Sequence, residues 1–164
     1  MIPMQQLADV LNGNLGMIRA TLADFSDQDM LVRPAPAANH ALWQLGHLAV
    51  TEPWLLAKAG YPQALPPPPE GWGEKFNPKN NKNDDPAFFP KKDEVLAYYD
   101  KVRAAFAAWI LTVKSEDLGK PMPPPVNGFA PTLGSLLLQT PVHAAMHVGQ
   151  FQVIRRKLGK PVLF

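Results

Sequence analysis

All four histidines of this 164-residue chain fall in two segments whose apolar residues have helical spacing. His143 and His147 are four residues apart, so in a helix they lie one turn apart, with about 6 Å between Cβ atoms, and can bind one metal ion together. His40 and His47 are seven residues apart, about 10.5 Å along a helix axis, which is too far to share an ion easily. The economical arrangement is therefore a three-histidine metal site of His47, His143 and His147, with coordination positions left open for water or substrate.

Three further polar residues on the same two segments could surround such a site. Gln139 and Gln150 recur with the histidine pair at spacings of four, four and three residues, so they either orient metal ligands or cross-link helices. His40 is expected at the rim of the pocket, or as a hydrogen-bonding group in the first turn of its helix.

The sequence offers few other catalytic groups near these histidines. Glu52 is the only acid of its segment, but it lies about 140° around a helix from His47, which makes it a weak candidate base. We interpret Trp43, one turn before His47, and Trp54 as aromatic residues of the core, with an aromatic platform for a substrate as the alternative. The chain has no cysteine, so thiol chemistry would have to use a thiol supplied by a substrate. The alternative to a metal site is a set of core histidines that satisfy one another.

Composition excludes several classes of protein. The net charge is +2, and 18% of residues are charged, below the usual ~25%, so nothing favours nucleic-acid binding. The cluster Arg155-Arg156-Lys157 falls at an expected helix end, where cations complement the helix dipole. The first residues lack the basic and apolar regions of a signal peptide, which predicts a cytoplasmic protein.

Proline placement divides the chain into helices and loops. Of the 19 prolines, eight lie in 61–90 and five in 121–131, and these two stretches are expected to be loops. Between them, apolar spacing predicts helices over residues 3–24, 39–60, 91–113 and 132–158, with Asn39 and Thr132 as N-caps. Four such helices in a single domain, 1–164, predict an all-α four-helix bundle with two long connections.

Two segments have unusual composition. The Pro-rich stretch 61–90 contains Trp72, Phe76, Phe88 and Phe89, so it is expected to be ordered and packed on the bundle. The stretch 132–154 has no charged residue, which raises a membrane-spanning interpretation. The polar residues Gln139, His143, His147 and Gln150 form a stripe along one edge of this segment. This polar stripe argues instead for a helix inside the bundle that faces inward on every side.

Several motifs together resemble a known family. The segment NHALWQLGHL at 39–48, TLGSLL at 132–137, HAAMHVGQF at 143–151 and the closing IRRKLG at 154–159 resemble the DinB-like (DinB/YfiT) superfamily of proposed metalloenzymes. The resemblance implies a four-helix bundle, often a homodimer, and a divalent metal on His47, His143 and His147. Composition and the polar residues of 132–154 separately argue against nucleic-acid and membrane partners. Family members often have a second histidine just before the last ligand, where this chain has Met146.

The resemblance also suggests activities. Similar proteins include S-transferases that use bacillithiol, mycothiol or glutathione, so we expect a metal-dependent transfer of a low-molecular-weight thiol to a small-molecule substrate. Imidazole ligands suit Zn or Ni, with Fe also possible. The alternatives are a metal-dependent hydrolase, or a non-catalytic dimeric module associated with stress. The apolar tail at 162–164 could pack at a dimer interface.

Overall fold

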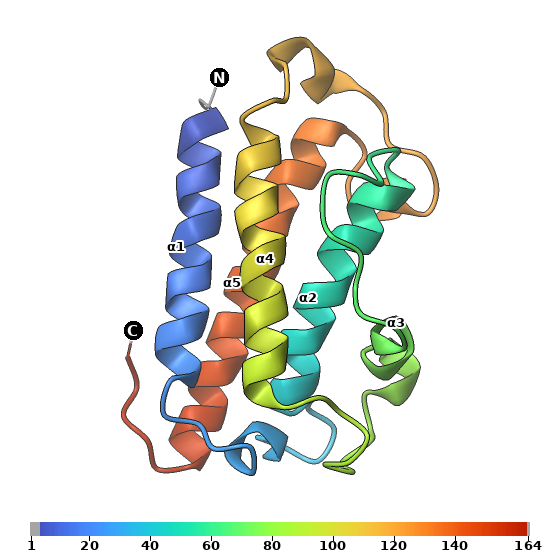
Figure 1. The fold of residues 1–164 in the computed structure, drawn as a ribbon. Coiled ribbons are helices and arrows are strands. Elements are labelled where there is room, and N and C mark those ends of the chain that lie inside the picture. The colour runs from blue at the N-terminus through green and yellow to red at the C-terminus, as the bar shows by residue number, and fades with distance from the viewer. Residues whose placement is uncertain (1–3, 164) are drawn as a thin grey trace.

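The computed structural model describes residues 4–163 and consists of four long helices packed side by side (Figure 1). They are α1 (Met4–Leu22), α2 (Ala41–Lys58), α4 (Lys92–Ile110) and α5 (Leu133–Lys157). A short helix, α3 (Trp72–Lys75), lies in the connection between α2 and α4. The prediction of an all-α four-helix bundle is confirmed, and each long helix lies within three residues of its predicted bounds; Pro3, the expected start of the first helix, lies outside the described residues.

The order of the helices around the bundle differs from their order in the chain. Helix α1 packs against α4 and α5, and α2 also packs against α4 and α5. The consecutive helices α1 and α2 therefore lie diagonally across the bundle, whereas the connection between the neighbouring helices α2 and α4 runs along its side from one end to the other (Figure 1). The connections between the long helices contain the 3₁₀ turns η1 (Asp29–Leu31), η2 (Pro78–Asn80), η3 (Ser115–Gly119) and η4 (Val126–Gly128).

Local hydrogen bonds set where α2 and α5 begin. Thr132 is the N-cap of α5, as expected, and its hydroxyl accepts the backbone N–H of Ser135 at 3.2 Å. The N-cap of α2 is His40, so the prediction of Asn39 is wrong by one residue. The reason is that the Nδ1 atom of His40 accepts the backbone N–H of Trp43 at 3.0 Å, which supplies the acceptor that a capping side chain normally provides.

Helix α5 has an exposed face, so the expectation that it faces inward on every side is wrong. Leu138, Val142, Met146 and Val153 are between 47 and 56% exposed. A helix of a four-helix bundle contacts two neighbours and leaves its third side open, whatever its composition. Among the described residues, no helix is long and apolar enough to cross a membrane.

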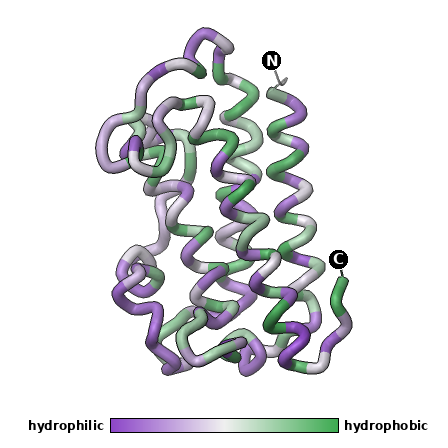
Figure 2. Tube along the Cα trace, turned by 180° about the vertical axis from the view of Figure 1, so that it is seen from behind, coloured by the Kyte–Doolittle hydropathy of each residue, from purple (hydrophilic) through white to green (hydrophobic). Residues whose placement is uncertain are grey.

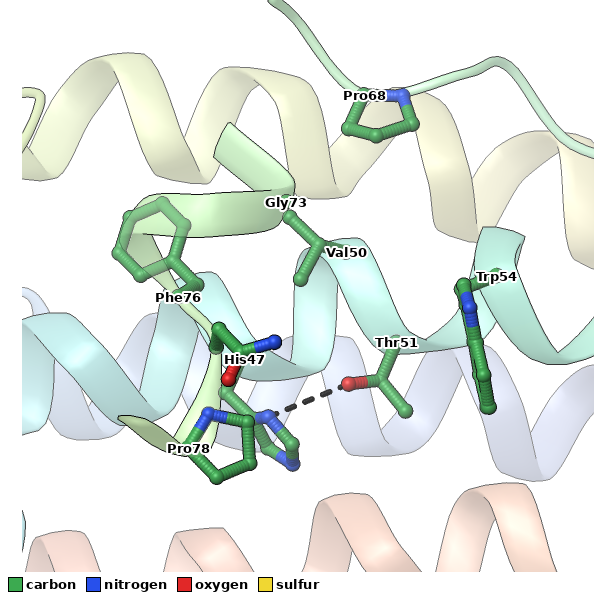
Figure 3. A pocket seen from close by; sticks show the side chains of 9 residues that line it. His47, Val50, Thr51, Trp54, Pro68, Gly73, Phe76 and Pro78 are labelled. Atoms are coloured by element: carbon green, nitrogen blue, oxygen red, sulfur yellow. Dashed lines mark hydrogen bonds between the residues drawn. The ribbon is translucent and has the colours of Figure 1, made fainter. Parts of the chain in front are cut away.

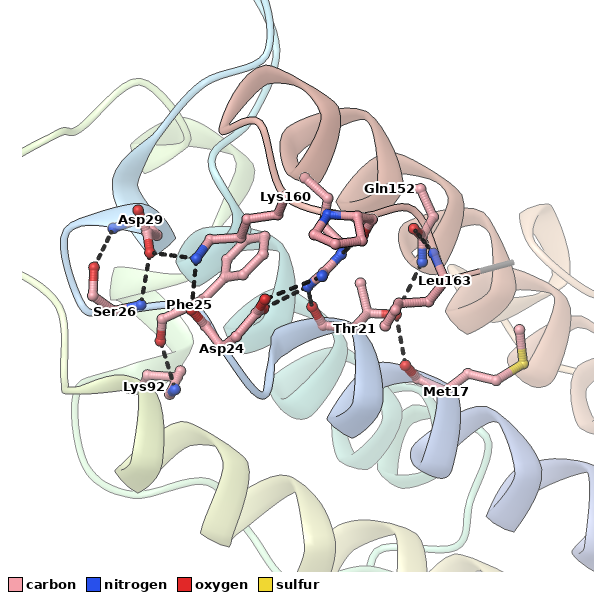
Figure 4. Close-up of polar contacts among 12 residues, drawn as sticks. Met17, Thr21, Asp24, Phe25, Ser26, Asp29, Lys92, Gln152, Lys160 and Leu163 are labelled. Atoms are coloured by element: carbon pink, nitrogen blue, oxygen red, sulfur yellow. Dashed lines mark hydrogen bonds and ion pairs between the residues drawn. The ribbon is translucent and has the colours of Figure 1, made fainter.

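A polar cluster ties the C-terminal end of α5 to the end of α1 (Figure 4). Arg155 is 2% exposed and donates to the Asp24 carboxylate at 2.5 Å and to the backbone carbonyl of Thr21 at 2.7 Å. This hydrogen-bonded pair lowers the pKa of Asp24. Arg155 lies at the end of a helix, as the sequence predicted. It also links α5 to the end of α1, which the sequence did not indicate.

The Pro-rich connection packs on the bundle, as expected. Trp72, Phe76 and Phe89 are buried, while Phe88 is half-buried. Phe76 lies so close to Gly46 of α2 that a Cβ atom at Gly46 would stand 2.1 Å from its ring. Figure 2 shows that the segment after α3 is mostly hydrophilic, whereas hydrophobic positions recur along the helices. The aromatic residues thus fix the connection against α2, next to His47.

Candidate metal centre

The structure brings together the three histidines that the sequence singled out. His47 from α2 and His143 and His147 from α5 each offer a ring nitrogen, and these atoms lie within 4.8 Å of one another. The two Nε2 atoms of His143 and His147 are 3.2 Å apart. A tetrahedral ion with bonds of about 2.0–2.1 Å holds its ligand atoms about 3.3 Å apart, so the cluster has the donor set and nearly the spacing that a metal ion requires.

A hydrogen-bond chain fixes the orientation of His147. The Nε2 group of Gln44 donates to the backbone carbonyl of Asn39 at 2.7 Å, so the Oε1 atom of Gln44 is the end that faces His147. That oxygen lies 2.8 Å from Nδ1 of His147 and must accept its proton. Nε2 of His147 is then the free nitrogen, which is the arrangement that partners of metal-binding histidines usually create.

The neighbours of His47 hold its ring in place. Trp43 stacks on the ring with 4.8 Å between centroids and 10° between planes. The hydroxyl of Thr51 lies 3.3 Å from Nδ1 of His47, which leaves Nε2 for the cluster. Trp43 is buried, as expected for a core aromatic, and it is also a direct neighbour of the candidate metal centre.

Burial keeps the histidines of the cluster neutral. It lowers the pKa of His47 to about 4 and that of His147 to about 3, and the nearby His143 contributes to both shifts. The pKa of His143 is also lowered, first by burial and then by the charge of Arg103. At neutral pH all three rings therefore have an unprotonated nitrogen, the form that binds metal ions.

His40 belongs to the start of α2 and lies apart from the cluster. Its Nδ1 caps the helix, and its Nε2 is 3.1 Å from the carbonyl oxygen of Asn83. Its fully buried ring also makes an edge contact with Phe89. Of the two roles expected for His40, the structure confirms the hydrogen bond to the first helical turn.

Glu52 is held in a buried ion pair and does not join the cluster. Its Oε1 atom lies 2.8 Å from Arg103 of α4 and accepts the hydroxyl of Tyr99 at 3.0 Å. Glu52 and Arg103 are at most 1% exposed. Burial raises the pKa of Glu52, and Arg103 offsets part of that rise. The carboxylate of Glu52 therefore binds α4, which agrees with its low ranking as a candidate base.

The predicted positions of Gln139, Gln150 and Trp54 are wrong. Both glutamines are exposed on α5, outside the cluster. Four residues of a helix make one full turn and about 40° more, so side chains at this spacing are not directly above one another. The polar stripe therefore winds around α5, from the exposed Gln139 to the buried His147. Trp54 is 47% exposed and lies in the wall of a pocket between α2 and the Pro-rich connection, not in the core.

Sequence reasoning missed Gln44 and Arg103. Gln44 interrupts a run of apolar residues one turn before Leu48 and three residues before His47, and a polar residue at such a buried position was a usable signal. Arg103 gave no such signal, since it is one of several charged residues in α4 and its partner is 51 positions earlier.

A four-helix bundle with a histidine cluster between its second and last long helices is the class that fold and site define. The family model of the DinB superfamily matches residues 11–151, and the chain belongs to this superfamily.

A solved structure of a conserved protein from Enterococcus faecalis is similar, with a TM-score of 0.72, 20% identity, and coverage of 98% of this chain and 99% of that one. The structure of YfiT from Bacillus subtilis has a TM-score of 0.68 at 14% identity, covering 96% and 89% of the two chains. YfiT is described as a probable metal-dependent hydrolase with an unusual four-helix bundle topology. No curated protein matches the sequence.

Proposed function

We propose that His47, His143 and His147 bind one divalent transition metal ion, Zn or Ni with Fe as a further choice, and that the protein transfers a small thiol to an electrophile. The observation that carries the proposal is the convergence of three neutral imidazoles within 4.8 Å, one of them oriented by Gln44. Three neutral ligands leave the charge of the cation uncompensated, which favours an anionic fourth ligand.

The residues of the chain have separable roles in this proposal. A bound divalent cation supplies the charge that deprotonates a coordinated thiol. Gln44 holds the proton of His147 on Nδ1, so that Nε2 points into the cluster. Trp43 covers one face of His47 and shields it from water. No protein thiol or strong base is needed for this chemistry, which agrees with a chain that has no cysteine.

A metal-dependent hydrolase is the second candidate. The description of YfiT, which has the same fold, favours it. Water is a much weaker acid than a thiol, and hydrolases commonly use a general base beside the metal. Glu52, the only acid of the segment that carries His47, is paired with Arg103. This pairing supports thiol transfer over hydrolysis.

The test begins with protein loaded with Co²⁺ in place of the native metal. Addition of glutathione or 2-mercaptoethanol is expected to produce a sulfur-to-cobalt charge-transfer absorption band that the His143→Ala variant lacks. The zinc- or nickel-loaded protein should then consume an electrophile only when thiol is present. Consumption at equal rates with and without thiol would support the hydrolase, and metal uptake with no new band and no turnover would support the non-catalytic module.

We also propose that two copies of the chain form a homodimer through an apolar groove between α1 and α5. Val10 of α1 and Leu138 and Val142 of α5 line this groove and are 49–53% exposed. Of the described residues that line the groove, none carries a charge. A two-fold dimer places the same patch against itself, so an uncharged patch avoids like-charge repulsion between the copies.

A further inference from the structure

A pocket of about 370 Å³ lies between α2 and the Pro-rich connection, and His47 forms part of its wall (Figure 3). Thr51 and Trp54 line it from α2, and Gly73, Phe76 and Asn77 line it from the connection. Its volume is within the range of about 300–1,000 Å³ that is usual for small-molecule sites. The pocket therefore adjoins the candidate metal centre through one of its ligands.

The pocket has the chemistry of a site for uncharged ligands. Of the described residues in its wall, none is charged, and most of the wall is apolar. The side chain of Trp54, which is 47% exposed, adds an aromatic surface to this wall. A charged group placed there would lose its hydration without gaining an ionic partner, which disfavours it strongly.

Two polar groups in the wall can orient a ligand. The hydroxyl of Thr51 is 3.3 Å from Nδ1 of His47, so it couples the pocket to the metal centre. The Oδ1 atom of Asn77 accepts the backbone N–H of Lys79 at 3.0 Å, which leaves its amide N–H₂ group as a donor. A neutral ligand with one hydrogen-bonding oxygen would suit this pair.

The wall formed by the connection is anchored rather than loose. Phe76 is fully buried against Gly46. Farther along the connection, Arg33 donates to the carbonyl oxygen of Asn81 at 2.8 Å and to the carboxylate of Asp84 at 2.7 Å. The pocket is thus formed before any ligand arrives, which lowers the entropic cost of binding.

We propose that this pocket binds the uncharged aromatic or aliphatic part of the substrate and so selects neutral, partly apolar molecules. The assignment of the ligand as the electrophilic substrate rests on the proposed function, whereas the binding preference itself does not. The pocket places such a group beside His47.

The experiment measures binding of three probes of similar size: benzyl alcohol, benzoate and benzylamine. Metal-free protein is used for the comparison, so that benzoate cannot bind through a metal ion. The indole N–H resonance of Trp54 in ¹⁵N-labelled protein reports occupancy. Benzyl alcohol is expected to bind at least tenfold more tightly than either charged probe. Equal affinity for the three probes, or no shift of the Trp54 resonance, would overturn the proposal.

A blocking variant tests the location. A Cβ at Gly73 would meet no atom within 4 Å, so Gly73→Leu can fill the pocket without a clash with the backbone. This variant should weaken benzyl alcohol binding at least tenfold. The matched control is Gly119→Leu, which also has open space around its Cβ and lies in η3, outside the pocket wall. Unchanged binding in Gly73→Leu, or equal losses in both variants, would contradict the location.

Failure of this proposal can be told apart from failure of the proposed function. If the protein takes up no metal but Gly73→Leu abolishes benzyl alcohol binding, the pocket is supported and thiol transfer is not. If thiol transfer occurs but Gly73→Leu leaves KM for a neutral aromatic electrophile unchanged, the substrate pocket is overturned and the metal chemistry stands.

Discussion

Gln44 controls which nitrogen of His147 is free, although it would never touch the metal itself. Replacing it with leucine removes the acceptor of the His147 proton, so the ring can rotate or change tautomer. We expect Gln44→Leu to weaken metal binding about 10–100-fold, measured by competition with a chromophoric chelator. Gln139→Leu, on the exposed side of α5, is the control and should bind metal normally. Equal affinities of the two variants would show that the hydrogen bond at 2.8 Å has no such role.

The cap formed by His40 predicts how stability depends on pH. Neutral His40 accepts at Nδ1 and donates at Nε2, and burial lowers its pKa from 6.5 to about 4. Between these values the unfolded chain binds more protons than the folded one. The contribution of His40 to the free energy of unfolding is therefore complete above pH 6.5 and is lost as pH falls toward 4, by up to about 3 kcal/mol.

Metal-free His40→Asn keeps a capping acceptor but has no titratable ring. Its free energy of unfolding, measured by urea denaturation at several pH values, should fall less steeply than that of the unaltered protein between pH 6.5 and 4. The cluster histidines titrate in both proteins and cancel in the difference. Parallel curves would contradict the assigned role.

At this scale the sequence predicted the three members of the cluster, because four-residue spacing and helical segments bring them to one place. It could not predict the roles of Gln139 and Gln150, since spacing defines a stripe and not the direction in which the stripe faces. Nor could it place Trp54, whose exposure depends on how much of α2 the Pro-rich connection covers.

At the scale of the helices, the pair Glu52–Arg103 joins α2 to α4 inside the core. Removing one partner leaves a buried charge without compensation. Arg103→Met alone should therefore lower the free energy of unfolding by about 3–5 kcal/mol. The double variant Glu52→Leu/Arg103→Met should recover much of this loss, since it removes both charges together.

Urea denaturation of both single variants and the double variant measures this coupling. As a control, Arg19→Met breaks the partly exposed ion pair with Asp100 and should change stability by no more than about 1 kcal/mol. Additive losses in the Glu52 and Arg103 variants would mean that the two residues contribute independently and that the pair does not hold the helices together.

The helices themselves were predictable because apolar spacing and clustered prolines mark both their length and their ends. Their arrangement was not. Which helices are neighbours depends on contacts such as Glu52 with Arg103 and Arg155 with Asp24, whose partners are far apart in the chain. Apolar spacing and the family resemblance both predicted a four-helix bundle, and only the structure showed that α1 and α2 lie diagonally across it.

At the scale of the whole molecule, the groove between α1 and α5 predicts self-association. Val10→Glu places a charge in both copies of the proposed interface and should convert a dimer to a monomer, measured by size exclusion with light scattering. Leu111→Glu is the matched control, since Leu111 is also 51% exposed but lies at the end of α4. The interface would be contradicted if the unaltered protein is a monomer, or if the Val10→Glu variant is still a dimer.

The apolar tail remains a separate prediction. Val162 and Leu163 are 39 and 43% exposed, so they are available to a second copy, while Phe164 lies outside the described residues. Deleting 162–164 alone should weaken the dimer less than Val10→Glu if the helical groove forms the main interface. Complete dissociation on deletion of the tail would show that the tail is the main contact.

The central claim is that the three histidines form a metal site, and metal content tests it most directly. Protein without a histidine tag, purified without chelator, would be analysed by elemental mass spectrometry beside the His143→Ala variant. The proposal predicts about one divalent transition metal ion per chain in the unaltered protein and none in the variant. A protein that is isolated without metal and takes up neither Zn nor Ni would contradict it, and His47, His143 and His147 would then be core residues.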